Sequence, residues 1–153
     1  MEMRITLNGE PRVWEGNPGE LLIDVLRRFG LKSVKRGCSE GDCGSCTVLL
    51  DGQAQRSCLL LAGQVAGRSI DTVESLGTAR EPHVLQEAFV QGGAVQCGFC
   101  TPGMLLAAKS LLDENPNPDQ EDVQEALDGN LCRCTGYKKI IEAVLDAAER
   151  TRS

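Results

Sequence analysis

The sequence has few aromatic side chains, a single histidine and no excess of positive charge. Aromatic residues make up 3% of its 153 residues, so a core must be built mainly from Leu, Val, Ile and Ala. The formal net charge is −6 at pH 7 and no basic stripe is visible, which argues against nucleic acid as a partner. No apolar run approaches the roughly 20 residues that a membrane-spanning helix needs, so we expect no membrane span.

Cysteine, by contrast, is abundant, with eight copies. The first residues, Met1 to Arg4, begin a strand-like pattern and show no apolar signal-peptide segment, so we expect a cytoplasmic protein. Stable disulfides are disfavoured in that reducing compartment. Metal binding is therefore the leading explanation for the cysteines.

The first half of the chain shows the pattern of a small α+β domain. Apolar and polar residues alternate over residues 3–7, and Asn8-Gly9 then predicts a hairpin turn into a second strand. Apolar residues at helical spacing predict a helix over residues 20–29. Further strands are expected at residues 47–50, 53–61 and 69–73, with a second hairpin turn at Asp51-Gly52.

The second half, which begins near residues 74–82, has the pattern of a helical bundle. Helices are expected at residues 83–91, 102–114, 118–128 and 137–150. The last has the clearest apolar stripe, which includes Tyr137 as a packing residue. Thr101 and Thr135 directly follow the two cysteine pairs of this half, and we expect them to be helix N-caps.

Four cysteines of the first half have the spacing of a plant-type [2Fe–2S] site. The pattern is Cys38-x4-Cys43-x2-Cys46, followed by Cys58 on the expected hairpin strand. A cluster held by four thiolates is anionic and needs backbone N–H groups pointing at its sulfurs. The loop contains glycines that allow positive φ and a close wrap, at Gly37, Gly41 and Gly44.

The second set of cysteines is less specific by its spacing. It consists of Cys97-x2-Cys100 and Cys132-x-Cys134, each pair at the start of an expected helix. Helix dipoles there would stabilise an anionic cluster. They would stabilise a structural zinc ion with four thiolates equally well, so spacing alone leaves both open.

A few charged residues near these motifs allow more than one interpretation. Lys35 and Arg36 precede the first loop, where they would face a partner, steady the cluster's charge or lie in solvent. Arg133 lies between two expected ligands, where interface contact or charge compensation is favoured. His83, at a helix start, is better explained as a surface residue than as a ligand, because eight thiols are available.

Three long motifs resemble those of the xanthine dehydrogenase family of molybdenum hydroxylases. The ferredoxin-like loop is residues 37–48, GCSEGDCGSCTV, and the others are residues 96–103, QCGFCTPG, and 129–137, GNLCRCTGY. The similarity runs over nearly the whole chain. Ser39 and Ser45 depart from the Gly and Ala of many members, and neither is a ligand position, so they bear on cluster tuning only.

The resemblance implies an α+β fold with two domains. Residues 1–76 would form a β-grasp, plant-type ferredoxin-like domain with the first cluster on Cys38, Cys43, Cys46 and Cys58. Residues 77–153 would form a four-helix bundle with the second cluster on Cys97, Cys100, Cys132 and Cys134. By the same resemblance Gln96 would hydrogen-bond the molybdopterin of a partner chain, and the Cys134 sulfur would lie close to the pterin's amino group.

The implied function is that of an electron-transfer subunit in a multi-subunit molybdenum hydroxylase. It would relay electrons one at a time from the molybdopterin site of a large subunit, through two [2Fe–2S] clusters, towards FAD on a medium subunit or another acceptor. The chain would be part of an oxidoreductase without a substrate site or catalytic residue of its own. A stand-alone ferredoxin, a zinc-stabilised interaction module and a relay running in the opposite direction are the alternatives.

Metal analysis of the purified chain tests the expectation of two clusters against the zinc alternative. We expect about four iron atoms and four acid-labile sulfides per chain, because four thiolates bind one two-iron cluster and the chain has eight. The protein should be red-brown with visible absorption, and zinc should be negligible. About two iron atoms together with one zinc atom per chain would show that only the first set binds a cluster.

Overall fold

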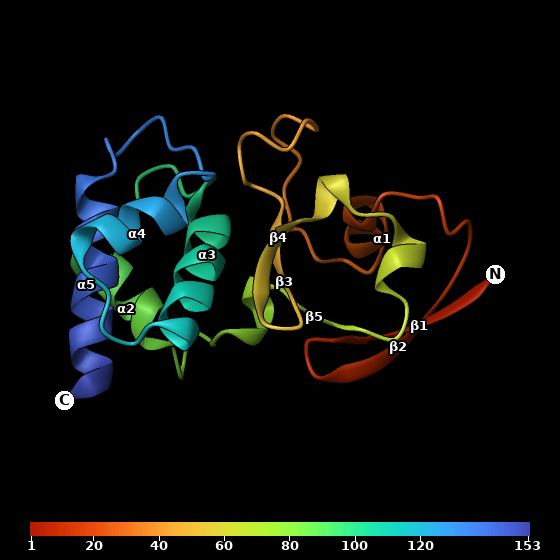
Figure 1. The fold of residues 1–153 in the computed structure, drawn as a ribbon, viewed down its shortest axis with the longest axis horizontal. Coiled ribbons are helices and arrows are strands. Elements are labelled where there is room, and N and C mark those ends of the chain that lie inside the picture. Colours follow the sequence, from red (N-terminus) through yellow and green to blue (C-terminus); the bar gives the residue numbers. More distant parts are fainter.

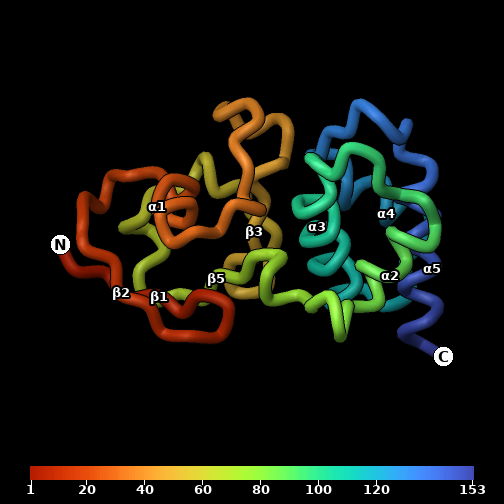
Figure 2. The backbone as a smooth tube through the Cα atoms, turned by 180° about the vertical axis from the view of Figure 1, so that it is seen from behind, coloured from red at the N-terminus to blue at the C-terminus, as the bar shows by residue number.

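The computed structural model describes residues 1–153 and shows an α+β fold with five strands and five α-helices. In Figure 1 the strands and the first helix lie at one end of an elongated molecule and the other four helices at the opposite end. The two chain termini lie at these opposite ends, as the reverse view in Figure 2 also shows. None of the helices combines the length and apolar character needed to cross a bilayer.

The five strands form one mixed sheet in the order β2-β1-β5-β3-β4. β1 pairs with β5 in parallel, and the other neighbours are antiparallel. Met3, Ile5 and Leu7 on β1 are buried while the residues between them are exposed, which confirms the alternation seen in the sequence. The strands are β1 (Glu2–Leu7), β2 (Glu10–Glu15), β3 (Thr47–Leu50), β4 (Gln53–Arg56) and β5 (Ser69–Asp71).

Both predicted hairpin turns are confirmed. Asn8 and Gly9 have φ angles of 52° and 80°, and Asp51 and Gly52 have φ angles of 49° and 83°. Two-residue turns with positive φ at both positions match the right-handed twist of the strands that they connect.

The strand expected over residues 53–61 is wrong in its second half. β4 ends at Arg56, and a 3-10 turn, η1 (Ser57–Leu59), follows it. The Ser57 N–H and hydroxyl both donate to the Cys46 carbonyl, at 3.3 and 2.7 Å. The 3-10 turn places Cys58 beside Cys46. Two further 3-10 turns are η2 (Ala62–Val65) and η3 (Val73–Ser75).

Helix α1 (Leu22–Arg28) packs on the sheet and closes the first core. Its apolar side is almost completely buried, with Leu22, Ile23 and Leu26 at most 1% exposed. They belong to a cluster of twelve buried residues that also includes Ile70 of the central strand β5 and two of the candidate ligands, Cys46 and Cys58.

The second core lies among the remaining helices and contains fourteen buried residues. Phe89 of α2, Met104 of α3 and Ile140 of α5 are among its largest members. The four predicted helices are therefore confirmed, and their bounds are α2 (Val84–Gln91), α3 (Thr101–Glu114), α4 (Gln120–Leu127) and α5 (Lys138–Arg152).

The expected capping roles of Thr101 and Thr135 are wrong. Thr101 is the first residue of α3, whose N-cap is Cys100. The N-cap of α5 is Tyr137, which has a left-handed φ of 70°. The Thr135 hydroxyl accepts a hydrogen bond from the Tyr137 N–H instead, at 3.2 Å, and so supports the turn that precedes the helix.

The two parts meet where α3 lies against β3 and β4, as Figures 1 and 2 show. Asn130 is 6% exposed, and its amide donates to the Gly44 carbonyl at 3.1 Å and to the Thr47 hydroxyl at 3.3 Å. Gly103 of α3 faces the same carbonyl, and a Cβ atom there would lie 2.5 Å from it. Arg56 donates to the Gly129 carbonyl at 2.8 Å, so hydrogen bonds and close backbone packing join the two parts.

Gly103→Ala tests whether this close contact decides stability. Alanine in a helix is more favourable than glycine by about 1 kcal/mol. The new methyl group would meet a carbonyl held by backbone, and overpacking of this kind costs about 1–3 kcal/mol. We expect net destabilisation, measured as a lower urea midpoint by circular dichroism. Gly19→Ala is the control, because Gly19 is exposed, has no positive φ, and a Cβ atom there would approach only the end of the Asn17 side chain, at 3.3 Å. A raised midpoint for Gly103→Ala would contradict the tight interface.

Candidate metal centres

All eight cysteines lie in loops and turns that gather at one edge of the molecule. The long loop between α1 and β3 and the loops before α3 and α5 all project at the upper edge in Figures 1 and 2. Cys46 and Cys58 are buried, Cys97 and Cys134 are exposed, and the other four are partly buried. No disulfide joins any of them. The fold thus brings both predicted sets of cysteines to the same side.

The first loop is shaped to stabilise negative charge on sulfur. The backbone N–H groups of Glu40 and Cys43 both donate to Cys38 Sγ, at 3.4 Å each. These hydrogen bonds lower the pKa of Cys38 to about 6. A sulfur that is stabilised as a thiolate in this way is suited to ligate iron.

The glycines of this loop act by two different means. Gly41 and Gly44 have φ angles of 85° and 73°, as predicted. Gly37 is not in a left-handed conformation; it is required because a Cβ atom there would lie 2.6 Å from Cys43 Sγ and 2.7 Å from Ser45 Oγ. The expectation of a positive φ at Gly37 is therefore wrong, and Ser39, with a φ of 63°, takes that conformation instead.

Cys58 completes the first set from the turn after β4. Its burial, and then its contact with Cys46, raise the pKa of the Cys58 thiol to about 11. Cys38 also lies close enough to Cys58 to affect its titration, so the four sulfurs form one group. A buried thiol of this kind becomes a thiolate only beside a cation, and iron supplies one.

The second set is brought together from two loops that are more than thirty residues apart in sequence. Cys134 lies close enough to Cys97 to shift its pKa, and Cys132 lies close enough to Cys100 to do the same. Burial, followed by the contact with Cys132, raises the pKa of Cys100 to about 12. The sulfurs meet in pairs, and no three acidic, histidine or cysteine side chains converge as a single metal ion would require. This pairing fits a two-iron cluster, in which each iron binds two thiolates.

Cys132 is supported by two residues of its own loop. Burial raises the pKa of its thiol, but hydrogen bonds from Thr135 outweigh burial and the net shift is downward. The Thr135 hydroxyl donates to Cys132 Sγ at 3.2 Å. The Tyr137 hydroxyl accepts from the Cys132 N–H at 2.9 Å, so Tyr137 fixes the ligand loop as well as packing against the core. Helical periodicity predicted only the packing role.

The two candidate centres are in direct contact through their ligand loops. The Leu131 N–H donates to the Cys43 carbonyl at 2.8 Å, and Leu131 immediately precedes Cys132. The Lys35 ammonium group donates to the carbonyls of Gly98 and Phe99, at 3.2 and 3.3 Å. These contacts link residues 63 to 88 positions apart, and no local sequence pattern indicates them.

The second centre opens onto an exposed face. Gln96, Cys97 and Cys134 are all exposed, and the nearby Phe99 and Leu131 are 48% and 54% exposed. Large apolar side chains beside exposed cysteines are a feature of a surface that another molecule covers. The residues predicted to face a partner's cofactor, Gln96 and Cys134, thus lie on one accessible side.

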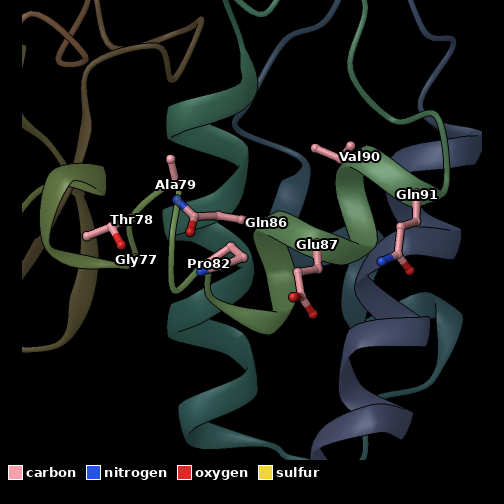
Figure 3. Close-up of a pocket in the computed structure, with 8 residues that line it drawn as sticks. All are labelled: Gly77, Thr78, Ala79, Pro82, Gln86, Glu87, Val90 and Gln91. Atoms are coloured by element: carbon pink, nitrogen blue, oxygen red, sulfur yellow. The ribbon is translucent and has the colours of Figure 1, made fainter.

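A cavity of about 380 Å³ lies outside the cysteine loops, beside α2, as Figure 3 shows. It is lined by Pro82, Gln86 and Val90 among others and contains no cysteine.

His83 also lies outside the cysteine loops. It accepts a hydrogen bond from the Leu85 N–H at 3.1 Å and caps α2, and burial lowers its pKa. It lies at the start of the helix, as expected, and is partly exposed.

Two family models match the chain one after the other. The model for the 2Fe-2S iron-sulfur cluster binding domain matches residues 5–72, and the model for the [2Fe-2S] binding domain matches residues 72–145. Each covers one complete set of four cysteines. The chain therefore carries two [2Fe–2S] clusters. The second set binds a cluster and not zinc, which was the alternative that the spacing left open.

The chain is also similar to characterised proteins over almost its whole length. It is 52% identical to the nicotinate dehydrogenase small FeS subunit of Eubacterium barkeri, covering 97% of this chain and 95% of that one. It is 46% identical to the xanthine dehydrogenase iron-sulfur-binding subunit of Escherichia coli O157:H7, with 96% and 93% covered. The structure of the aldehyde oxidoreductase of Desulfovibrio desulfuricans ATCC 27774 matches 99% of this chain at 47% identity with a TM-score of 0.96, and this match spans 17% of that longer chain.

Cys43→Ser should remove the first cluster and leave the second. Serine is a poor ligand for iron, and the N–H groups of the loop would lose the anion that they surround. The backbone contact of residue 43 with Leu131 does not depend on the side chain, so the second ligand loop should keep its place. Electron paramagnetic resonance of the reduced full chain should show one of its two cluster signals.

Cys100→Ser is the reciprocal control and should remove the other signal. Loss of both signals from a folded Cys43→Ser chain would contradict the separate assembly of the two centres.

Proposed function

The chain belongs to the iron–sulfur subunits of the xanthine dehydrogenase family of molybdenum hydroxylases, and from this we propose how it works as the electron-transfer subunit of an oxidoreductase. It relays electrons one at a time from a molybdopterin site on a partner subunit, through its two [2Fe–2S] clusters, towards FAD or another acceptor. The observation that carries this proposal is the contact between the two ligand loops, from the Leu131 N–H to the Cys43 carbonyl.

Residues 1–76 and 77–153 act as two cluster-binding domains in this proposal. The strand order β2-β1-β5-β3-β4 with one helix on the sheet supports a ferredoxin-like β-grasp for the first. Four helices around a separate core of fourteen residues support a four-helix bundle for the second. Each domain then has its own core to hold its own four ligands.

The sulfur pairs suggest which two ligands share an iron atom. Because Cys46 lies close enough to Cys58 to shift its pKa, we propose that these two share one iron of the first cluster and that Cys38 and Cys43 share the other. In the second cluster the pairs are Cys97 with Cys134 and Cys100 with Cys132. Each iron would thus be held by residues whose sulfurs the fold already brings together.

When bound, each cluster supplies a site that accepts and releases a single electron. The chain's residues fix where these sites lie and how easily solvent reaches them. Cys46 and Cys58 are 3% and 4% exposed, so the first cluster is anchored in the core of its domain. The backbone N–H groups around Cys38 offset negative charge, which is one of the means by which a protein tunes a cluster's potential.

Only a few covalent bonds and one hydrogen bond separate the ligand loops of the two centres. From the first ligand loop it passes through the Cys43 carbonyl and the Leu131 N–H to the adjacent residue Cys132. Asn130 and Arg56 brace this connection on both sides by donating to the carbonyls of Gly44 and Gly129. Hydrogen bonds on both sides of the contact would keep the separation of the two centres constant.

The exposed face around Gln96 and Cys134 docks on a large molybdopterin-binding subunit in this proposal. The Gln96 side chain would hydrogen-bond the pterin, and the Cys134 sulfur would lie next to the pterin's amino group. A region similar to this chain forms 17% of the longer chain of the aldehyde oxidoreductase, which supports a larger partner for this one. A medium FAD-binding subunit would contact the first domain. Eight unpaired cysteines fit a reducing cytoplasm, where we place the assembly.

Gln96→Ala tests the proposed docking. Gln96 is exposed and is not a ligand, so the isolated variant should keep both clusters and an unchanged visible spectrum. In the assembled enzyme, loss of one buried hydrogen bond should cost roughly 1–3 kcal/mol, observed as lower molybdenum content or slower reduction of the clusters by substrate. Gln55→Ala, at an exposed glutamine on β4, is the matched control and should change neither.

Cys134→Ser should impair both properties, because this residue is a cluster ligand and, in the proposed assembly, the protein sulfur nearest the pterin. If Gln96→Ala has normal molybdenum content and normal substrate-to-cluster electron transfer, the contact with the pterin is wrong.

A further inference from the structure

Lys35 connects the ligand loops of the two clusters by its main chain and its side chain. Its N–H donates to the Ser45 carbonyl at 3.1 Å, and its carbonyl accepts from the Ser45 hydroxyl at 3.2 Å. Ser45 lies between Cys43 and Cys46 of the first set. The Lys35 side chain extends away from this loop, and its ammonium group donates to the carbonyls of Gly98 and Phe99, which lie between Cys97 and Cys100.

The positive charge of Lys35 is held in place and is not neutralised by a carboxylate. Its ammonium group forms no ion pair, whereas the neighbouring Arg36 is paired with Asp24. The ammonium group lies 4.9 Å from the centre of the Phe99 ring, which covers it from another side. Two carbonyl oxygens and an aromatic face orient a cation without cancelling its charge. The side chain is also only partly exposed, so solvent screens its charge less than that of a free surface lysine.

We propose that Lys35 sets the reduction potential of the second cluster relative to the first. This inference depends on the proposed function, because it assigns a role towards clusters held by the eight cysteines. A cluster gains one negative charge on reduction, and a nearby fixed cation stabilises that state more than the oxidised one. The charge lies in the second ligand loop although its residue is anchored in the first. Lys35 therefore raises the reduction potential of the second cluster more than that of the first. Because the residue spans the contact between the two domains, this effect depends on that contact.

The charge can be separated from the hydrogen bonds by two substitutions. Lys35→Gln removes the charge and keeps a hydrogen-bond donor, and Lys35→Arg keeps both. The readout is the midpoint potential of each cluster in the full chain, from redox titration followed by electron paramagnetic resonance. For Lys35→Gln we expect the ratio of reduced to oxidised second cluster, at a fixed potential, to fall about tenfold, which corresponds to about 59 mV for one electron.

The first cluster should shift less in the same variant, and Lys35→Arg should restore most of the second cluster's potential. Lys32→Gln is the matched control, because Lys32 lies on the same loop, is exposed, and its side chain donates only to the Arg27 carbonyl. It should shift neither potential.

The proposal would be overturned by an unchanged second potential in Lys35→Gln, by an equal shift of both clusters, or by a shift in Lys35→Arg as large as in Lys35→Gln. A Lys35→Gln chain that loses its second cluster would show that the residue is structural, and would overturn it too. Failure of the proposed function is distinguished beforehand, because a wild-type chain without four iron atoms and two cluster signals has no second potential to shift.

Discussion

The hydrogen bond from the Leu131 N–H to the Cys43 carbonyl is the contact on which the rest of the structure depends. It joins the loop of one cysteine set to the loop of the other. Such an approach requires two backbones to pass with little between them, which explains the small residues around it. A Cβ atom at Gly44 would lie 2.4 Å from the Gly129 carbonyl, and one at Gly103 would lie 2.5 Å from the Gly44 carbonyl. The glycines of the interface are therefore needed for contact, and only some of them for backbone conformation.

The close approach of two anionic centres carries an electrostatic cost, and the loops contain features that offset it. Around the first set the compensation comes from backbone N–H groups, which lower the pKa of Cys38 to about 6. Around the second it comes from backbone groups such as that of Phe99, which lowers the pKa of Cys97, and also from side chains, with the Thr135 hydroxyl on Cys132 and the Lys35 ammonium group in the loop between Cys97 and Cys100. The net charge of the chain is −6, so this local positive character is not a property of the whole surface.

The two centres also differ in their access to solvent, and this difference suits a relay. Cys46 and Cys58 belong to the core of the sheet part, whereas Cys97 and Cys134 are exposed on the helical part. The first centre is thus anchored in a core, and the second is open to solvent. The exposed apolar side chains of Phe99 and Leu131 lie on the face beside this second centre. In the proposed assembly this is the face that a molybdopterin subunit covers.

Local sequence patterns were sufficient to predict most of the elements. Hairpin turns such as Asn8-Gly9 and the stripe of α5 depend on local backbone preference and periodicity, so they could be predicted. The errors are local patterns that other contacts override. A 3-10 turn at Ser57–Leu59 ends β4 early, and Tyr137 takes the N-cap expected at Thr135.

How the two sets of cysteines face one another became visible only in three dimensions. The pairing of Cys97 with Cys134, the Asn130 contacts and the reach of Lys35 to Gly98 join residues dozens of positions apart. Periodicity and spacing describe the chain only over a few turns or a single loop. Contacts between distant loops depend instead on how two separate cores pack against each other, and no local pattern contains that information.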